Sequence, residues 1–113
     1  MPDREEILRR LTLGDVTCLD SLVDDRRKVG GTPALDYVGE ALVKLGALIV
    51  TDGSDVTWHH TVAAALDAGL TADQVVDALV VLAPVIGGTR VVAVAPKLAL
   101  ATGFDVAAAL ELR

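Results

Sequence analysis

The feature that most constrains this chain is a series of apolar segments with helical spacing, each followed by a glycine. Between residues 32 and 50, apolar side chains recur at steps of three and four, which predicts a helix with one apolar face. Residues 54–69, "SDVTWHHTVAAALDAG", predict a second helix that begins after a capping residue and ends at Gly69. Thr71 and Gln74 have the spacing of a capping box, which predicts that another helix begins there. The chain is therefore predicted to be all-α, built from antiparallel helix hairpins.

The valines of residues 71–87 also permit a strand, but Asp73, Gln74 and Asp77 fall at helical spacing, and this favours the helix. After Gly87 and Gly88, residues 89–103 predict a helix that is capped by Thr89, bent near Pro96 and closed by Gly103. Residues 104–113 predict a last short helix.

The N-terminal third has a different pattern. Residues 4–11 predict a short amphipathic helix, and residues 15–23 predict a second short turn or helix. Charges, glycines and a proline in residues 24–33, "DDRRKVGGTP", predict a loop that could act as a hinge. We therefore expect an N-terminal helical arm over residues 1–31 and a helical domain over residues 32–113, within one compact domain overall.

Composition limits the classes of partner and the compartment. The chain has 113 residues and a formal net charge of -6, which argues against nucleic acid as a partner. The single cysteine, Cys18, allows neither an internal disulfide nor a CxxC pair, and the N-terminus lacks a signal-peptide pattern, so we expect a cytoplasmic protein. The apolar run over residues 78–88 is about half the roughly 20 residues of a membrane span. Since Arg90 and Lys97 follow it, we expect no membrane partner, and a subunit interface instead.

Two stretches carry a resemblance to a known family. The sequences "ALVKLGALI", residues 41–49, and "AALDAGLTADQVVDALVVLAPVIGGTRVVAVAPKLALATGFD", residues 64–105, resemble the carboxymuconolactone decarboxylase and alkylhydroperoxidase D-like superfamily, in particular its small single-domain members. The resemblance implies an alkylhydroperoxidase D-like helical fold that assembles into trimers or hexamers. It also implies a small pocket between helices near the subunit contacts.

The superfamily's reactive residues are replaced in this chain. The alkylhydroperoxidase branch has a CxxC pair followed by a histidine, and the matching positions are Ser54, Thr57 and Thr61. A hydroxyl cannot serve as a peroxide-reducing thiolate, so a thiol peroxidase activity would depend on Cys18. The important histidine of the decarboxylase branch also matches Thr61, whereas this chain has histidines one and two places earlier.

Those two histidines are the candidate catalytic residues. One step along a helix rotates a side chain by about 100°. His60 and Trp58 therefore flank a face of small side chains, while His59 points the other way. The small face comprises Thr57, Thr61, Ala64, Ala65 and Ala68. In one interpretation His60 is a general acid or base beside a pocket, with Trp58 as an apolar wall and Thr57 and Thr61 as substrate-binding residues. In the other, the small face lets two helices approach closely and His60 is an ordinary side chain.

Other candidate sites have less support in the sequence. Asp55 lies four residues before His59 and could orient its imidazole or simply favour the helix N-terminus. We expect no metal site, because alanines occupy the places four residues after each histidine. In "GGTR", Arg90 could bind a substrate carboxylate or pair with an acidic residue of another helix. Cys18 is predicted to be a small buried hydrophobic residue, because the stretch around it, "VTCLD", supplies no positive charge that would favour a reactive thiolate.

Two classes of function remain open. The first is a lyase or isomerase without a cofactor that acts on a small carboxylated molecule, with His60 as acid or base and Arg90 as anchor. The alternative is a non-catalytic, homo-oligomeric binding or scaffold protein. A thiol peroxidase is a distant third. Homo-oligomerisation is expected in each case, and a small-molecule ligand is the expected further partner.

Overall fold

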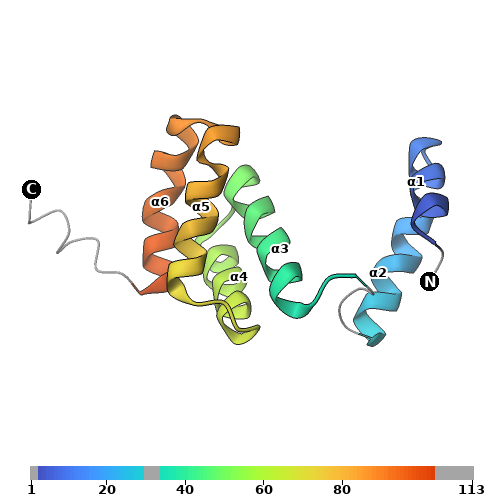
Figure 1. The fold of residues 1–113 in the computed structure, drawn as a ribbon, viewed down its shortest axis with the longest axis horizontal. Coiled ribbons are helices and arrows are strands. Elements are labelled where there is room, and N and C mark those ends of the chain that lie inside the picture. Colours follow the sequence, from blue (N-terminus) through green and yellow to red (C-terminus); the bar gives the residue numbers. More distant parts are fainter. Residues whose placement is uncertain (1–2, 30–33, 104–113) are drawn as a thin grey trace, which may run out of the picture. The chain divides into compact units, whose positions relative to one another are not determined.

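The computed structural model describes residues 3–29 and 34–103, and all regular secondary structure in these residues is helical (Figure 1). This confirms the all-α prediction. Contacts divide the chain into two compact units, Met1–Ala34 and Leu35–Arg113. The first unit holds helices α1 and α2, and the second unit holds helices α3 to α6.

The first unit contains α1 (Arg4–Thr12) and α2 (Thr17–Val29). The side chain of Asp3 caps α1, since its Oδ1 accepts a hydrogen bond from the backbone N–H of Glu6 at 2.9 Å. Helix α2 runs through most of the segment that was predicted to be a loop, so that prediction is wrong as far as Val29. The first residue that strongly disfavours a helix is Gly30, and the charged residues before it are compatible with one. Cys18 is buried, as predicted.

Helices α3 (Tyr37–Thr51) and α4 (Asp55–Asp67) form the first hairpin of the second unit. Helix α3 begins five residues later than predicted, because the Asp36 side chain caps it by accepting from the N–H of Gly39 at 2.6 Å. Ser54 caps α4 in the same way. Gly69, which follows α4, has a positive φ of 111°, in agreement with its prediction as the stop.

Helices α5 (Ala72–Ile86) and α6 (Gly88–Thr102) form the second hairpin. The predicted capping box of Thr71 and Gln74 is present in full. Thr89 does not cap α6, because the helix already begins at Gly88 and a side chain inside the first turn no longer faces the first free N–H groups. Gly103 ends α6 in the left-handed conformation, as predicted. The predicted final helix lies outside the described residues.

The four helices α3 to α6 pack around one apolar core, with α5 and α6 side by side in Figure 1. Side chains from all four helices meet there with almost no exposed surface. The largest fully buried side chains are those of Leu45, Ile49, Trp58, Val62, Val75 and Val94. Because each of the four helices buries at least two apolar residues and short connections join them, the hairpins hold their loops in fixed positions.

Candidate functional site

The two histidines lie on the solvent-exposed surface of α4. In the part of the chain that the structure describes, neither imidazole takes part in a hydrogen bond or an ion pair, and Asp55 does not bond to His59. Each imidazole is therefore free to contact a molecule from solution, but no neighbouring group orients it.

Trp58, by contrast, belongs to the core. Its side chain is 1% exposed, and its indole Nε1 donates a hydrogen bond to Oδ1 of Asp52 at 2.8 Å. The structure therefore places Trp58 among the core helices and not beside His60 at the surface. The reason is the phase of α4, since Trp58, Val62 and Ala65 form the buried face of that helix.

Asp52 is the centre of a polar cluster that joins the α3–α4 connection to α6. Besides the indole of Trp58, its carboxylate accepts hydrogen bonds from Nζ of Lys97, at 3.0 Å to Oδ1 and 2.9 Å to Oδ2. The backbone N–H of Gly53 adds a bond of 2.7 Å. The ammonium of Lys97, followed by the indole and the backbone amide, holds the pKa of Asp52 well below its ordinary range. A carboxylate with so many donors is a poor base, so this cluster is better suited to fixing the connection than to proton transfer.

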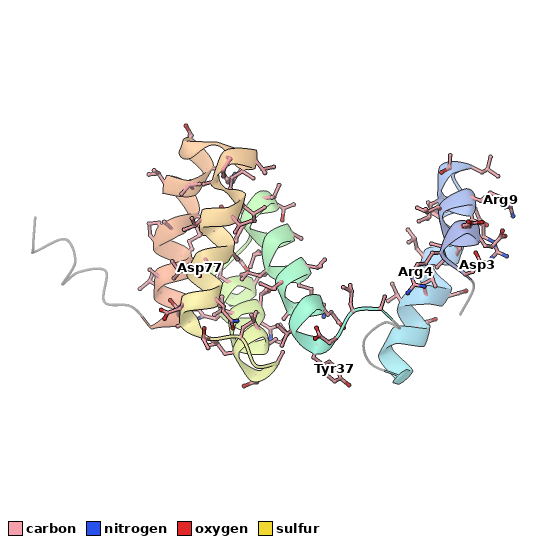
Figure 2. All side chains as sticks on the ribbon, in the orientation of Figure 1. Asp3, Arg4, Arg9, Tyr37 and Asp77 are labelled. Atoms are coloured by element: carbon pink, nitrogen blue, oxygen red, sulfur yellow. The ribbon has the colours of Figure 1, made fainter. Side chains whose placement is uncertain are left out.

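A small pocket between α3 and α4 carries the other notable polar pair. Oε1 of Glu40 lies 3.0 Å from Nζ of Lys44, and the Glu40 side chain is 15% exposed. The pocket has a volume of about 160 Å³ and a floor of small side chains from α4. Its lining residues are Tyr37, Glu40, Ala41, Lys44, Ala64, Ala65 and Ala68. We refer to it as the α3–α4 pocket; Tyr37, at the start of α3, is labelled in Figure 2.

The family model described as Carboxymuconolactone decarboxylase family matches residues 26–99, which is well over half of the chain. The chain belongs to the carboxymuconolactone decarboxylase family. The resemblance of the two sequence stretches is thereby confirmed. A search of curated proteins and a search of solved structures each found no significant match.

In this member of the carboxymuconolactone decarboxylase family, Ser54 and Thr57, which the sequence resemblance matches to the redox cysteines, form a helix cap. The hydroxyls of Ser54 and Thr57 lie 3.0 Å apart, and Ser54 Oγ accepts a hydrogen bond from the N–H of Thr57 at 3.2 Å. Thr57 is exposed, and Thr61, one turn further along α4, is half-buried. The two hydroxyls at the start of α4 therefore stabilise the beginning of the helix.

Arg90 lies in the first turn of α6 and is half-buried. Among the described residues its guanidinium forms no hydrogen bond or ion pair, and Arg90 does not line the α3–α4 pocket. Arg90 can therefore bind a ligand or another chain, but the structure does not bring it together with His60 in one site.

No group of three or more histidine, cysteine, aspartate or glutamate side chains among the described residues is arranged to hold a metal ion. No single helix over residues 3–29 and 34–103 has both the length and the apolar character of a membrane span. Helices α4 and α5 reach that length and composition only as a pair, with a bend of 118° between them.

Sequence analysis did not single out the Asp52 cluster or the α3–α4 pocket. A signal for the pocket was present, because Glu40 and Lys44 stand four residues apart, the spacing of an ion pair on one helix face. Lys97 also gave a signal, as the one charged residue of the apolar segment 91–103. Neither signal shows which residue from a distant part of the sequence completes the site, such as Asp52 beside Lys97.

Proposed function

We propose that this family member is a lyase or isomerase without a cofactor, acting on a small carboxylated molecule in the α3–α4 pocket. The observation that carries the proposal is the ion pair between Glu40 and Lys44 at the mouth of a small, alanine-floored pocket. It places one anionic and one cationic side chain beside a space of about 160 Å³, which suits a small organic molecule.

The roles follow from the chemistry of the side chains. Lys44 can bind the substrate carboxylate through a charge-assisted hydrogen bond. Glu40 is then released from its partner and can remove or deliver a proton. His60 does not line the pocket, but it lies one turn before Ala64, which does, so it is the second candidate for the proton transfer.

A decarboxylation shows which groups the proposed reaction needs. The bond between carbon and the carboxylate breaks, carbon dioxide leaves, and the electron pair stays on carbon until a proton is delivered there. An isomerisation needs the same proton movement without loss of carbon dioxide. Both reactions need one anchoring cation and one acid or base, which the pocket provides.

The test uses 4-carboxymuconolactone, the compound in the family's name, together with a panel of small carboxylates. Release of carbon dioxide and rearrangement of the substrate are followed by mass spectrometry and NMR. We expect Glu40→Gln to lower turnover by about 100-fold or more, because general acid–base catalysis contributes at least that factor. Lys44→Met is expected to raise KM, since it removes the anchor.

His60→Ala is compared with His59→Ala, a matched control, because both neighbouring histidines are exposed but they face different sides of α4. Arg90→Ala tests the alternative anchor. Full turnover in both Glu40→Gln and His60→Ala would overturn the proposed mechanism, whereas a loss confined to Arg90→Ala would move the anchor to α6.

The second candidate function is a non-catalytic, homo-oligomeric binding or scaffold protein. It is favoured by the exposed histidines, whose imidazoles have no orienting partner among the described residues. A correctly assembled protein without histidine-dependent turnover across the whole panel would support it. A thiol peroxidase has the weakest support, because Cys18 is buried and lacks the accessibility that such a thiol needs.

A further inference from the structure

We propose that the groove between α3 and α5 binds an apolar molecule with a primary amine at one end, such as an alkylamine. The groove has a volume of about 420 Å³, which is within the range of ligand-binding pockets. Its lining residues are Leu42, Gly46, Leu70, Gln74, Asp77, Ala78, Val81 and Leu82, and we call it the α3–α5 groove. It shares no lining residue with the α3–α4 pocket, so this site is separate from that of the proposed reaction.

The walls of the α3–α5 groove leave space for a narrow apolar chain. On the α3 wall, Gly46 has no side chain, and a Cβ atom there would meet only Cδ1 of Leu82, at 3.7 Å. On the α5 wall, Ala78 has only a methyl group. Leucine side chains from α3, from α5 and from the α4–α5 connection line much of the remainder. A hydrocarbon chain in the groove would therefore lose contact with water, which favours its binding.

The α3–α5 groove is polar at one end. Gln74, Asp77, Ala78 and Val81 follow one another at helical spacing, so they form one stripe of α5 along the groove. The first two residues of this stripe are polar and the last two are apolar. Seven residues separate Gln74 from Val81, or about 10 Å along the helix axis. A ligand that matches the stripe has a polar group at one end and an apolar body of similar length.

Asp77 makes the polar end anionic. It is exposed, is labelled in Figure 2, and forms no hydrogen bond or ion pair with another described residue. Gln74 already has a partner, because its Oε1 accepts a hydrogen bond from the N–H of Thr71 at 2.9 Å. The exposed carboxylate of Asp73 lies one turn before Asp77 on α5, and no cationic side chain is among the described residues that line the groove. Two carboxylates four residues apart repel each other, so charge complementarity favours a ligand with an ammonium group.

The first test compares three ligands that share one hydrocarbon chain and differ in charge. Octylamine, octanol and octanoate are titrated into the full chain, and binding is measured by isothermal titration calorimetry and NMR. We expect octylamine to bind about fivefold more tightly than octanol, which is the upper range for an exposed ion pair. Octanoate is expected to bind most weakly, because its carboxylate would lie beside Asp77.

Variants of Asp77 test the role of the charge. Asp77→Asn should remove the advantage of octylamine and leave the affinity for octanol unchanged. Asp77→Lys should make octanoate the preferred ligand. Asp55→Asn is the matched control, since Asp55 is exposed on α4 and does not line the groove. It changes the net charge by the same amount as Asp77→Asn and should leave all three affinities unchanged.

Variants with an altered wall test the place of binding. Ala78→Leu should fill the α3–α5 groove and weaken the binding of octylamine by about tenfold, because excluding about two methylene groups from an apolar site costs that much. Ala63→Leu, at an exposed position of α4 outside the groove, is its control. Val81→Asn removes apolar wall without touching the core, since Val81 is 73% exposed, and it should also weaken binding. Circular dichroism checks that each variant is folded.

Three results would overturn the proposal. One is equal affinity of the natural chain for octylamine and octanol, because the carboxylate would then select nothing. Another is binding that survives both Ala78→Leu and Val81→Asn, because the ligand would then lie elsewhere. The third is a chain that binds none of the three ligands, as expected if its assembly covers the α3–α5 groove.

Discussion

The indole N–H of Trp58 reaches Oδ1 of Asp52 at 2.8 Å, and the same oxygen accepts from Nζ of Lys97 at 3.0 Å. Asp52 adopts a positive φ of 62°, which is unfavourable for a residue with a side chain. The three donors around its carboxylate stabilise that conformation and connect the α3–α4 turn to α6. The buried tryptophan is thus the link between the polar cluster and the apolar core.

The first prediction concerns that link. Trp58→Phe keeps an aromatic ring in the core but removes the indole donor and leaves a small cavity. We expect it to lower the free energy of unfolding by about 1–3 kcal/mol, as measured by urea denaturation. In an Asp52→Ala background the same change should cost less, because the hydrogen bond is already absent. An equal loss of unfolding free energy in both backgrounds would mean that the hydrogen bond between Trp58 and Asp52 does not contribute to stability.

The second prediction concerns pH. Because the folded pKa of Asp52 is lowered by Lys97, Trp58 and Gly53, its contribution to stability is fully present above the unfolded pKa of about 4. The contribution is lost as pH falls from there through the folded pKa. We therefore expect the thermal unfolding midpoint to fall more steeply below about pH 4 in the natural chain than in Asp52→Asn. Lys97→Met should flatten the same part of the curve, and an unchanged curve would contradict the assignment.

The third prediction is a stabilising substitution on α3. Gly46 is in the middle of the helix, and a Cβ atom there would meet only Cδ1 of Leu82, at 3.7 Å. Gly46→Ala should raise the free energy of unfolding by about 0.5–1 kcal/mol, because alanine loses less backbone entropy in a helix. The measurement is urea denaturation of both chains at the same protein concentration, since Gly46 also lines a groove of about 420 Å³ between α3 and α5.

The fourth prediction is the same substitution, glycine to alanine, at Gly69, where we expect it to destabilise the fold instead of stabilising it. Its φ of 111° lies in a region that residues with a Cβ atom rarely adopt. Gly69→Ala should lower the free energy of unfolding by about 1–2 kcal/mol. Gly46→Ala and Gly69→Ala thus control for each other, and a gain of stability at Gly69 would show that the turn can rearrange without strain.

Local signals made most of the second unit predictable from the sequence. Thr71 and Gln74 fix the start of α5, and Gly69 and Gly103 stop α4 and α6, because caps and left-handed residues act within one turn. Capping signals did not identify a single residue at the start of α4, because several residues there could act as the cap. Asp52, Ser54 and Asp55 could all have capped α4, and the structure uses Ser54 for the cap and Asp52 for a distant lysine.

The candidate sites were less predictable for a physical reason. Asp52 and Lys97 are 45 residues apart, and only the packing of α4 against α6 brings them together. The position of Trp58 depends on the exact phase of α4, which turns a side chain by about 100° per residue. Residue spacing alone could place His60 and Trp58 on either side of a face, but it could not show which of them enters the core.

Ser54 and Thr57 place two hydroxyls where the backbone would also be suited to two thiols. Their hydroxyls lie 3.0 Å apart at the start of a helix, where the macrodipole stabilises negative charge and lowers the pKa of a thiol. Ser54 and Thr57 differ from a pair of cysteines by oxygen in place of sulfur and by the methyl group of Thr57, so the start of α4 has a backbone that brings two such side chains together but holds hydroxyls there.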